Sequence, residues 1–400
     1  MIRFILPVIL TILIFNVCGK TPKVEDGREV TFYPAYGYRY GTDWQINIRA
    51  WVHENSRAKA AEFLTKVAEG GIKCAGPEQE TLKLRLADFF DKDLPGQQVE
   101  IQFDSDTDHE KYKLPESDLN GLAEKRLNLS AEKASALLAS QRSSKGWLTY
   151  HAVNGNGGKG RIQLIEPEGV SVVTDIDDTI KITEVPAAQA TVLTNTFCRD
   201  FRAAPGMAEM YKGFGDVSFH YVSGGPWQLF GPLQAYLVDG LGGYPEGTFH
   251  LSYFPKNILA KDTREILIEA LAGSLEKTYN HKIKEITLLM ERFPHRKFIL
   301  VGDSGEVDPE VYRRIRIEHP LQVQEIRIRD VVNDDEVNHN RLEGMNIVKA
   351  EIICATQDHY EKLRAMIKGL HQPAYLPNTL APCIQQPNKI QAFARRLRHK

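Results

Sequence analysis

Two aspartates stand two positions apart directly after an apolar run of the sequence. The run Val172-Val-Thr174 leads into Asp175 and Asp177, and Thr179 follows them. A carboxylate in this position can act as a nucleophile, and a second carboxylate close by can donate and accept protons. In an open α/β sheet, ligands bind just beyond the carboxyl ends of the strands, so Asp175 stands where a reactive group is expected.

Further polar groups follow the later apolar runs of the chain. Ser223 comes directly after the run 217–222, and Asp303 closely follows the run 297–301. Lys282 is expected just before a helix. Because the carboxyl ends of parallel strands meet at one edge of a sheet, we expect these groups to converge with the two aspartates.

The elements around these residues predict an α/β domain over residues 169–335. Continuous apolar runs alternate there with helical patterns, which is typical of a parallel sheet covered on both faces. The predicted strands are 170–173, 217–222, 248–251, 297–301 and 323–328, and the segment 282–293 fits a helix between two of them.

The preceding residues, 20–168, predict a β-rich, sandwich-like module. Short segments alternate apolar and polar residues, which is the period of a half-buried strand. The predicted strands are 30–33, 45–52, 81–86 and 99–103, and one helix is predicted over 130–140 with Ser130 at its start.

The order of these motifs resembles that of the haloacid-dehalogenase (HAD) phosphatase superfamily. More closely, it resembles the phosphatidate phosphatases of the actin-patch-associated type and their bacterial relatives. The resemblance covers about 170–335, is weaker near 32–38 and 48–51, and is absent beyond about 340. The matching segments are Val173–Lys181, Tyr221–Trp227, His281–Lys282, Phe298–Tyr312 and Ile328–Val331.

The resemblance implies a HAD-like, Rossmann-type parallel sheet and a mechanism through an aspartyl-phosphate. Asp175 would be the nucleophile, and Asp177 would protonate the leaving group and then deprotonate water. Carboxylates beside a phosphate require a cation, and oxygen ligands suit Mg²⁺. The metal would be held by Asp175, Asp303 and the backbone carbonyl of Asp177.

The same resemblance assigns the substrate-binding groups. Ser223, the N–H groups near Gly224, and Lys282 would bind the phosphoryl oxygens, and Thr179 would fix the loop after the nucleophile. Asp308 would lie in the second shell or hold Lys282.

Simpler interpretations stay open at several positions. Asp177 could be a solvated turn residue, and Ser223 could be a plain turn serine. Lys284 competes with Lys282 for the cationic role. Asp308 could instead cap the helix that follows it. Asp178, which is not part of the pattern, is expected to be a solvated turn residue.

The resemblance, together with the expected export, implies phosphatidate as the substrate, which would be converted to diacylglycerol and phosphate. Few residues separate Thr179 from the strand before Ser223, so any cap is small and the site is open to a large substrate such as a lipid at a membrane surface. Two alternatives remain: a phosphatase of a soluble ester or phosphoprotein, and a non-catalytic envelope protein that binds lipid.

The ends of the chain and its overall charge bear on the cellular location and the partners of the protein. The chain has 400 residues and a formal net charge of -2, which does not favour nucleic acid as a partner. Residues 1–19 resemble a secretory or lipoprotein signal, with cleavage after Gly19 or lipidation of Cys18 as the two endings. The protein is therefore expected to be exported, as a periplasmic, membrane-anchored or secreted protein. Residues 336–400 are an extension of unknown role, and the oligomeric state is left open.

The cysteines do not form a metal-binding pattern. Cys74, Cys198, Cys354 and Cys383 are widely scattered, and no CxxC pair occurs. Buried free thiols are the expected state, with disulfides in an exported protein as the alternative.

Overall fold

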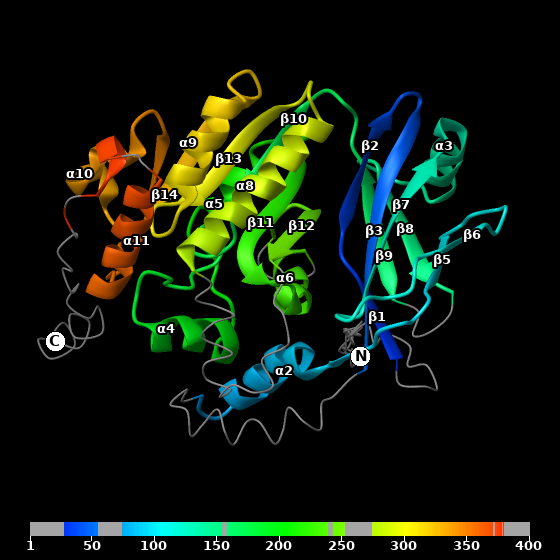
Figure 1. Ribbon diagram of the computed structural model, residues 1–400, viewed down its shortest axis with the longest axis horizontal. Helices are drawn as coiled ribbons and strands as arrows, with labels where there is room; N and C mark the ends of the chain where they lie inside the picture. The colour runs from blue at the N-terminus through cyan, green and yellow to red at the C-terminus, as the bar shows by residue number, and fades with distance from the viewer. Residues whose placement is uncertain are drawn as a thin grey trace, which may run out of the picture.

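The computed structural model describes residues 28–54, 74–153, 158–238, 243–252, 274–370, 373–377 and 379. The predicted signal at 1–19 and Cys383 lie outside these residues. Within them the fold is α/β, with a mixed sheet beside a parallel sheet (Figure 1).

The first sheet has nine strands in the described part of the chain and confirms that this region is β-rich. Its path runs β1-β3-β2-β9-β8-β5-β6, with β4 and β7 also paired to β3, and β2 pairs with β9 in parallel. The strands are β1 (Arg28–Phe32), β2 (Ala35–Tyr40), β3 (Asp43–Glu54), β4 (Lys92–Asp93), β5 (Glu100–Phe103), β6 (Lys111–Lys113), β7 (Leu122–Leu129), β8 (Trp147–Ala152) and β9 (Lys159–Leu164).

The helix predicted in this region is confirmed as α3 (Ala131–Ser140). Ser130 is its N-cap, and the Ser130 hydroxyl accepts a hydrogen bond from the backbone N–H of Lys133 at 3.1 Å. This bond satisfies one of the free donors at the start of the helix.

The predicted strand 81–86 is wrong, because these residues belong to helix α2 (Glu78–Phe90). Leu82, Leu86 and Phe89 are buried at helical spacing, whereas Leu84 is 62% exposed. A short run in which every second residue is apolar fits both the repeat of a strand and that of an amphipathic helix. Here the run is helical, and its apolar face packs into the core beneath the parallel sheet.

The second sheet is parallel throughout its six strands in the described residues. Its order is β12-β11-β10-β13-β14-β15, so the first strand in the chain lies between the second and the fourth. Strands are therefore added on one side of β10 up to β12 and on its other side from β13 onward, which creates a topological switch point at the carboxyl ends of β10 and β13. The strands are β10 (Val170–Thr174), β11 (Ser218–Pro226), β12 (Gly247–Ser252), β13 (Lys297–Asp303), β14 (Val323–Asp330) and β15 (Asn346–Lys349).

Helices cover both faces of this sheet (Figure 1). Successive strand residues point to opposite faces, so Val172 packs with α5, α6 and α2, while Val173 packs with α8, α9 and α11. The helical elements are α4 (Gln189–Leu193), the π-helix η1 (Thr194–Cys198), α5 (Met207–Lys212), η2 (Trp227–Leu229), α6 (Phe230–Leu237), α8 (Leu275–Arg292), α9 (Asp308–Glu318), α10 (Asp334–Val337), η3 (His339–Leu342), α11 (Gln357–Gly369) and η4 (Pro373–Tyr375).

A disulfide joins Cys74, just before α2, to Cys198 at the end of η1, with a Cα–Cα distance of 5.5 Å. Cys354 is also disulfide-bonded. The expectation of free thiols is therefore wrong for these three cysteines, because folding brings together positions 124 residues apart.

Replacing both Cys74 and Cys198 by Ser should lower the free energy of unfolding by about 2–5 kcal/mol, since the bond restricts the unfolded chain over a long loop. Denaturant unfolding of the double variant and of the unaltered protein measures the difference. Equal midpoints for the two proteins would mean that this bond adds no stability.

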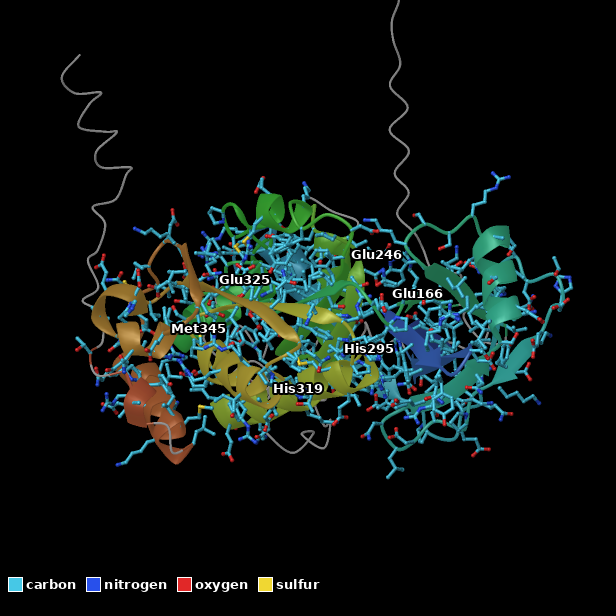
Figure 2. The ribbon with its side chains drawn as sticks, turned by 90° about the horizontal axis from the view of Figure 1, so that it is seen from above. Glu166, Glu246, His295, His319, Glu325 and Met345 are labelled. Carbon is cyan, nitrogen blue, oxygen red and sulfur yellow. A yellow bond between two sulfur atoms is a disulfide. The ribbon has the colours of Figure 1, made fainter. Side chains whose placement is uncertain are left out.

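The two sheets meet through a polar and aromatic contact. The Tyr36 ring of β2 packs edge-on against His220 of β11, with 5.9 Å between ring centroids. Arg161 of β9 forms an ion pair with Glu246, and Figure 2 shows Glu246 and Glu166 at this junction. Residues far apart in the chain thus fix the parallel sheet to the β-rich region.

His220 gives this contact a pH dependence. Its Nδ1 lies 2.7 Å from the Thr248 hydroxyl, and burial lowers the His220 pKa well below its usual value. Below about pH 6.5 the unfolded chain therefore takes up a proton that the folded protein does not, and stability falls as the pH falls.

We predict that His220→Gln reduces this loss by up to about 1.4 kcal/mol per pH unit between pH 6.5 and 5. Urea unfolding across this range measures the slope for each protein. His295→Gln, at an exposed position, is the control and should leave the slope unchanged. An unaltered slope in His220→Gln would contradict the prediction.

Candidate active site

Asp175 lies at the carboxyl end of β10, at the switch point. Its backbone N–H donates to the Val301 carbonyl of β13 at 2.9 Å, which continues the strand pairing up to the aspartate. The side chain is buried, and its Oδ1 accepts from Lys282 Nζ at 2.7 Å. Its Oδ2 has no hydrogen-bond partner among the described residues. A buried carboxylate oxygen without a partner is costly, and it is the atom available to a ligand.

Lys282 lies within α8, and the expectation that it precedes the helix is wrong. The helix begins at Leu275, with Ser274 as its N-cap, so Lys282 is two turns inside it. There it is buried and forms ion pairs with both Asp175 and Asp308. Burial would lower the Lys282 pKa, but the charges of Asp175 and Asp308 outweigh it and hold the pKa well above its usual value.

The competing lysine does not reach the site. The Lys284 side chain is 77% exposed, and its Nζ lies 3.8 Å from a carboxylate oxygen of Glu285. Two residues along a helix face different directions, so only Lys282 points at Asp175.

Three carboxylates form a compact cluster at the strand ends. Ligand oxygens of Asp175, Asp303 and Asp308 all lie within 4.8 Å of one another, and all three residues are buried. The Thr179 hydroxyl lies 3.4 Å from Asp303 Oδ2. Asp308 approaches closely because Gly302 has no side chain: a Cβ there would lie 2.3 Å from Asp308 Oδ2.

The cluster has the chemistry of a site for a hard divalent cation. Burial, followed by the charges of Asp308 and Asp175, raises the Asp303 pKa well above its usual value. Burial likewise raises the Asp175 pKa, against the opposing charge of Lys282. One lysine does not balance three carboxylates, so a bound cation would favour the ionised forms of Asp175 and Asp303. With the unpartnered Asp175 Oδ2, the residues fit a metal with oxygen ligands.

Asp177 lies beside this cluster and is held by neighbouring polar groups. Its Oδ1 accepts from Lys181 and, at 2.6 Å, from the Thr183 hydroxyl. Burial would raise the Asp177 pKa, but Lys181 and Thr183 outweigh it and keep the pKa below its usual value. Asp177 is thus ionised in the absence of substrate.

Ser223 lies on β11 close to Asp177. Its hydroxyl accepts from the Gly225 N–H at 3.0 Å and lies 3.5 Å from Asp177 Oδ2. Gly224 permits α8 to approach, since a Cβ there would lie 2.6 Å from the Thr278 hydroxyl oxygen. The second strand thus brings its serine to the same edge as the aspartates, as predicted from its position.

Asp178 is buried, and its interpretation as a solvated turn residue is wrong. Its carboxylate accepts backbone N–H bonds from Thr183, Glu184 and Val185 at 2.6–2.8 Å. Its carbonyl accepts from Arg329 of β14 at 2.6 Å. Asp178 therefore fixes the loop after the nucleophile, and no local sequence pattern reveals these partners.

Arg341, in η3, is a second residue that the sequence did not indicate. It is fully buried and forms ion pairs with Glu310 at 2.8 Å and Asp334 at 2.6 Å. It also donates to the carbonyls of Ser304 and Glu306, in the loop that follows Asp303. Arg341 thereby positions a loop of the carboxylate cluster from outside the segment 169–335.

Comparisons with known proteins agree with this geometry. Residues 170–330 match the family described as phosphatidate phosphatase APP1, catalytic domain. Phosphatidate phosphatase APP1 of Saccharomyces cerevisiae is 32% identical over 193 residues, which cover 45% of this chain and 30% of the yeast protein. An uncharacterised protein of Schizosaccharomyces pombe is 24% identical over 177 residues, which cover 43% of this chain and 27% of that protein.

These matches concern one part of each protein. The chain spans less than a third of the length of either fungal relative. Among solved structures, a carbohydrate esterase aligns over 87% of this chain and 99% of its own with 9% identity and a TM-score of 0.20, a similarity too low to support an argument.

The matched segment contains Asp175, Ser223, Lys282, Asp303 and Asp308, which are the residues that the structure gathers at the strand ends. The resemblance to the actin-patch-associated phosphatases is therefore confirmed. Residues 170–330 are thus similar to the catalytic domains of APP1-type phosphatidate phosphatases.

Proposed function

We propose that the protein is a Mg²⁺-dependent phosphatase that hydrolyses phosphatidate to diacylglycerol and phosphate. The observation that carries this proposal is the group formed by Asp175, Lys282 and Asp303 at the switch point of the parallel sheet. The family of residues 170–330 supports the lipid substrate.

In the first step, Asp175 Oδ2 attacks the phosphorus atom and the bond from phosphorus to the ester oxygen breaks. The leaving alkoxide takes a proton from Asp177, and an aspartyl-phosphate remains on Asp175. Lys181 keeps Asp177 ionised in the free protein. Asp177 would acquire the proton when the substrate binds, because a phosphate dianion beside Asp177 raises the pKa of Asp177.

In the second step, water attacks the phosphorus atom of the aspartyl-phosphate and Asp177 takes up the proton of that water. Phosphate leaves, and the Asp175 carboxylate is restored. Lys282 and the Ser223 hydroxyl would donate to the phosphoryl oxygens as negative charge develops. Mg²⁺, held by Asp175, Asp303 and the Asp177 carbonyl with Asp308 adjacent, would supply charge neutralisation.

The sheet supports a HAD-like fold as part of the proposal. Asp175 follows the central strand β10, and Asp303 is the last residue of its neighbour β13. The segment between Thr179 and β11 holds only the short helices α4 and α5 with η1, which fits a small cap.

Export is proposed on the residues at the start of the chain and on the disulfides. Disulfides persist in oxidising compartments and are rare in the cytosol, so the bond between Cys74 and Cys198 favours an exported protein. Among the described residues, no helix has the length and apolar character needed to cross a bilayer.

The test is phosphate release from phosphatidate in mixed micelles, with Mg²⁺ and with a chelator. Release that requires the metal and disappears in Asp175→Asn supports the proposal. Release from glycerol 3-phosphate or a phosphopeptide but not from phosphatidate would keep the nucleophile and exclude the lipid substrate. No release from any ester, together with vesicle binding, would favour a non-catalytic lipid-binding protein.

A further inference from the structure

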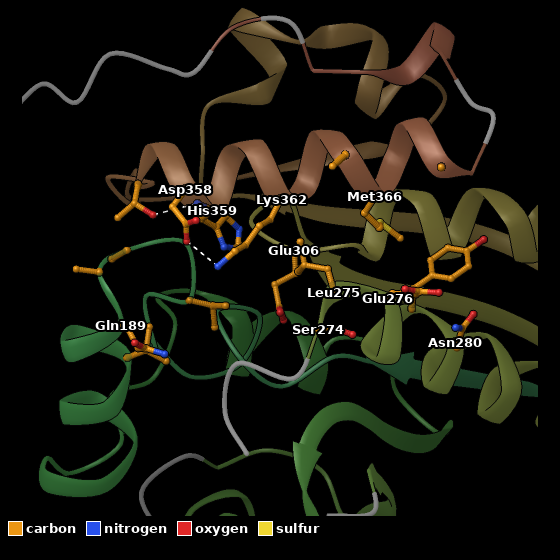
Figure 3. Close-up of a pocket in the computed structure, with 18 of the residues that line it drawn as sticks. Gln189, Ser274, Leu275, Glu276, Asn280, Glu306, Asp358, His359, Lys362 and Met366 are labelled. Atoms are coloured by element: carbon orange, nitrogen blue, oxygen red, sulfur yellow. Dashed lines mark hydrogen bonds and ion pairs between the residues drawn. The ribbon is translucent and has the colours of Figure 1, made fainter. Parts of the chain in front are cut away.

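A cavity of about 990 Å³ lies beside the carboxylate cluster. It is bounded by α11, by the start of α8 and by the segment 185–193 of the small cap. Figure 3 shows Lys362 and Met366 reaching from α11 into this space, with Leu275 and Glu306 facing them. Helix α11 lies beyond the segment 170–330 that matches the phosphatase family.

Part of the cavity wall is formed by loops that also carry or hold the catalytic groups. Glu306 lines the cavity and stands three residues after Asp303. Glu306 belongs to the loop between Asp303 and Asp308, two carboxylates of the buried cluster. On another side, Val185 lines the cavity and donates its N–H to Asp178.

The walls are largely apolar, and charged groups stand at the edge and, in the case of Glu306, on the side of the catalytic loops. The apolar lining includes Val192, Leu193, Leu275, Tyr279, Met366 and Leu370. Asp358 and Lys362 form an ion pair at 2.7 Å with both side chains largely exposed. An apolar interior with a few polar groups is typical of a ligand site, and the volume lies at the upper end of the usual range of about 300–1,000 Å³.

Helix α11 is fixed to the active-site loops. His359 Nε2 lies 2.7 Å from the Gly305 carbonyl oxygen, in the loop after Asp303. The Thr356 N–H donates to the Pro186 carbonyl at 2.9 Å. The helix therefore connects the loop after Asp303 to the cap and forms one wall of the cavity.

We propose that this cavity binds the fatty-acyl chains of a phosphatidate whose phosphate lies at Asp175. The inference rests on the proposed function. The part of a phosphomonoester beyond the ester oxygen must extend away from Asp175. The cavity is a space with apolar walls next to the catalytic loops, and it can receive that part of the substrate. A small soluble ester would leave most of it filled with water, whereas acyl methylenes would gain about fourfold in affinity for each group buried.

The test uses Ala365→Trp, which fills the cavity from an exposed position of α11, and Lys368→Trp, which adds the same bulk to the helix outside the lining. We expect Ala365→Trp to raise the KM for dioctanoyl phosphatidate at least about tenfold and to leave the KM for glycerol 3-phosphate unchanged. Lys368→Trp should change neither. Equal effects of Ala365→Trp on both substrates, or no effect on either, would overturn the proposal.

A binding measurement separates this proposal from the proposed function. A dansyl-labelled fatty acid is titrated into the Asp175→Asn protein alone and combined with either Ala365→Trp or Lys368→Trp. Weaker binding caused by Ala365→Trp and not by Lys368→Trp supports an acyl site even if no phosphate ester is turned over. Binding of the probe that neither tryptophan alters would place the lipid elsewhere and refute the acyl site even in an active phosphatase.

Discussion

Asp175→Asn is expected to lower phosphate release by at least about 10³-fold while the protein stays folded. The amide cannot form the aspartyl-phosphate, and no other described carboxylate has an unpartnered buried oxygen beside Lys282. Single-turnover phosphate release and thermal unfolding of the same preparation measure both properties. A variant that retains substantial turnover would exclude Asp175 as the nucleophile.

The stability of this variant should depend on pH in a defined direction. Burial raises the Asp175 pKa in the folded protein, so its ionisation destabilises the fold as the pH rises above the unfolded value of about 3.9. Without metal, Asp175→Asn should therefore gain stability relative to the unaltered protein from pH 4 toward pH 7. Asp335→Asn, at a partly exposed carboxylate, is the control. A relative stability that falls over this range would contradict the crowding of carboxylates inferred here.

Lys282→Met is expected to abolish phosphate release and to lower the free energy of unfolding by about 3–5 kcal/mol in the absence of metal. The substitution keeps the apolar bulk but leaves Asp175 and Asp308 buried without their common cation. The loss should shrink at acid pH, because protonated carboxyls need no counter-charge. Urea unfolding at pH 5 and pH 8, with and without Mg²⁺, measures these differences.

Lys284→Met is the matched control, because Lys284 is exposed on the same helix. It should change the free energy of unfolding by no more than about 0.5 kcal/mol and leave turnover intact. A larger effect at Lys284 than at Lys282 would reverse the assignment of the cationic residue.

The sequence by itself determined where the reactive residues stand along the chain. Asp175, Ser223 and Asp303 each follow an apolar run, and such runs form the buried strands β10, β11 and β13. Because parallel strands end at one edge, local patterns were enough to predict that these residues converge. The N-cap Ser130 was likewise evident, since capping depends on neighbours within one turn.

Tertiary structure alone decided the features that depend on distant partners. The run 81–86 fits both the strand repeat and the helical repeat, and packing beneath the parallel sheet makes it helical. The buried Arg329 donates to the backbone carbonyl of Asp178, which is 151 positions away, and Cys74 is paired with Cys198. A buried charge or thiol is stabilised by whatever group folding places beside it, and its own neighbours in the sequence do not specify that group.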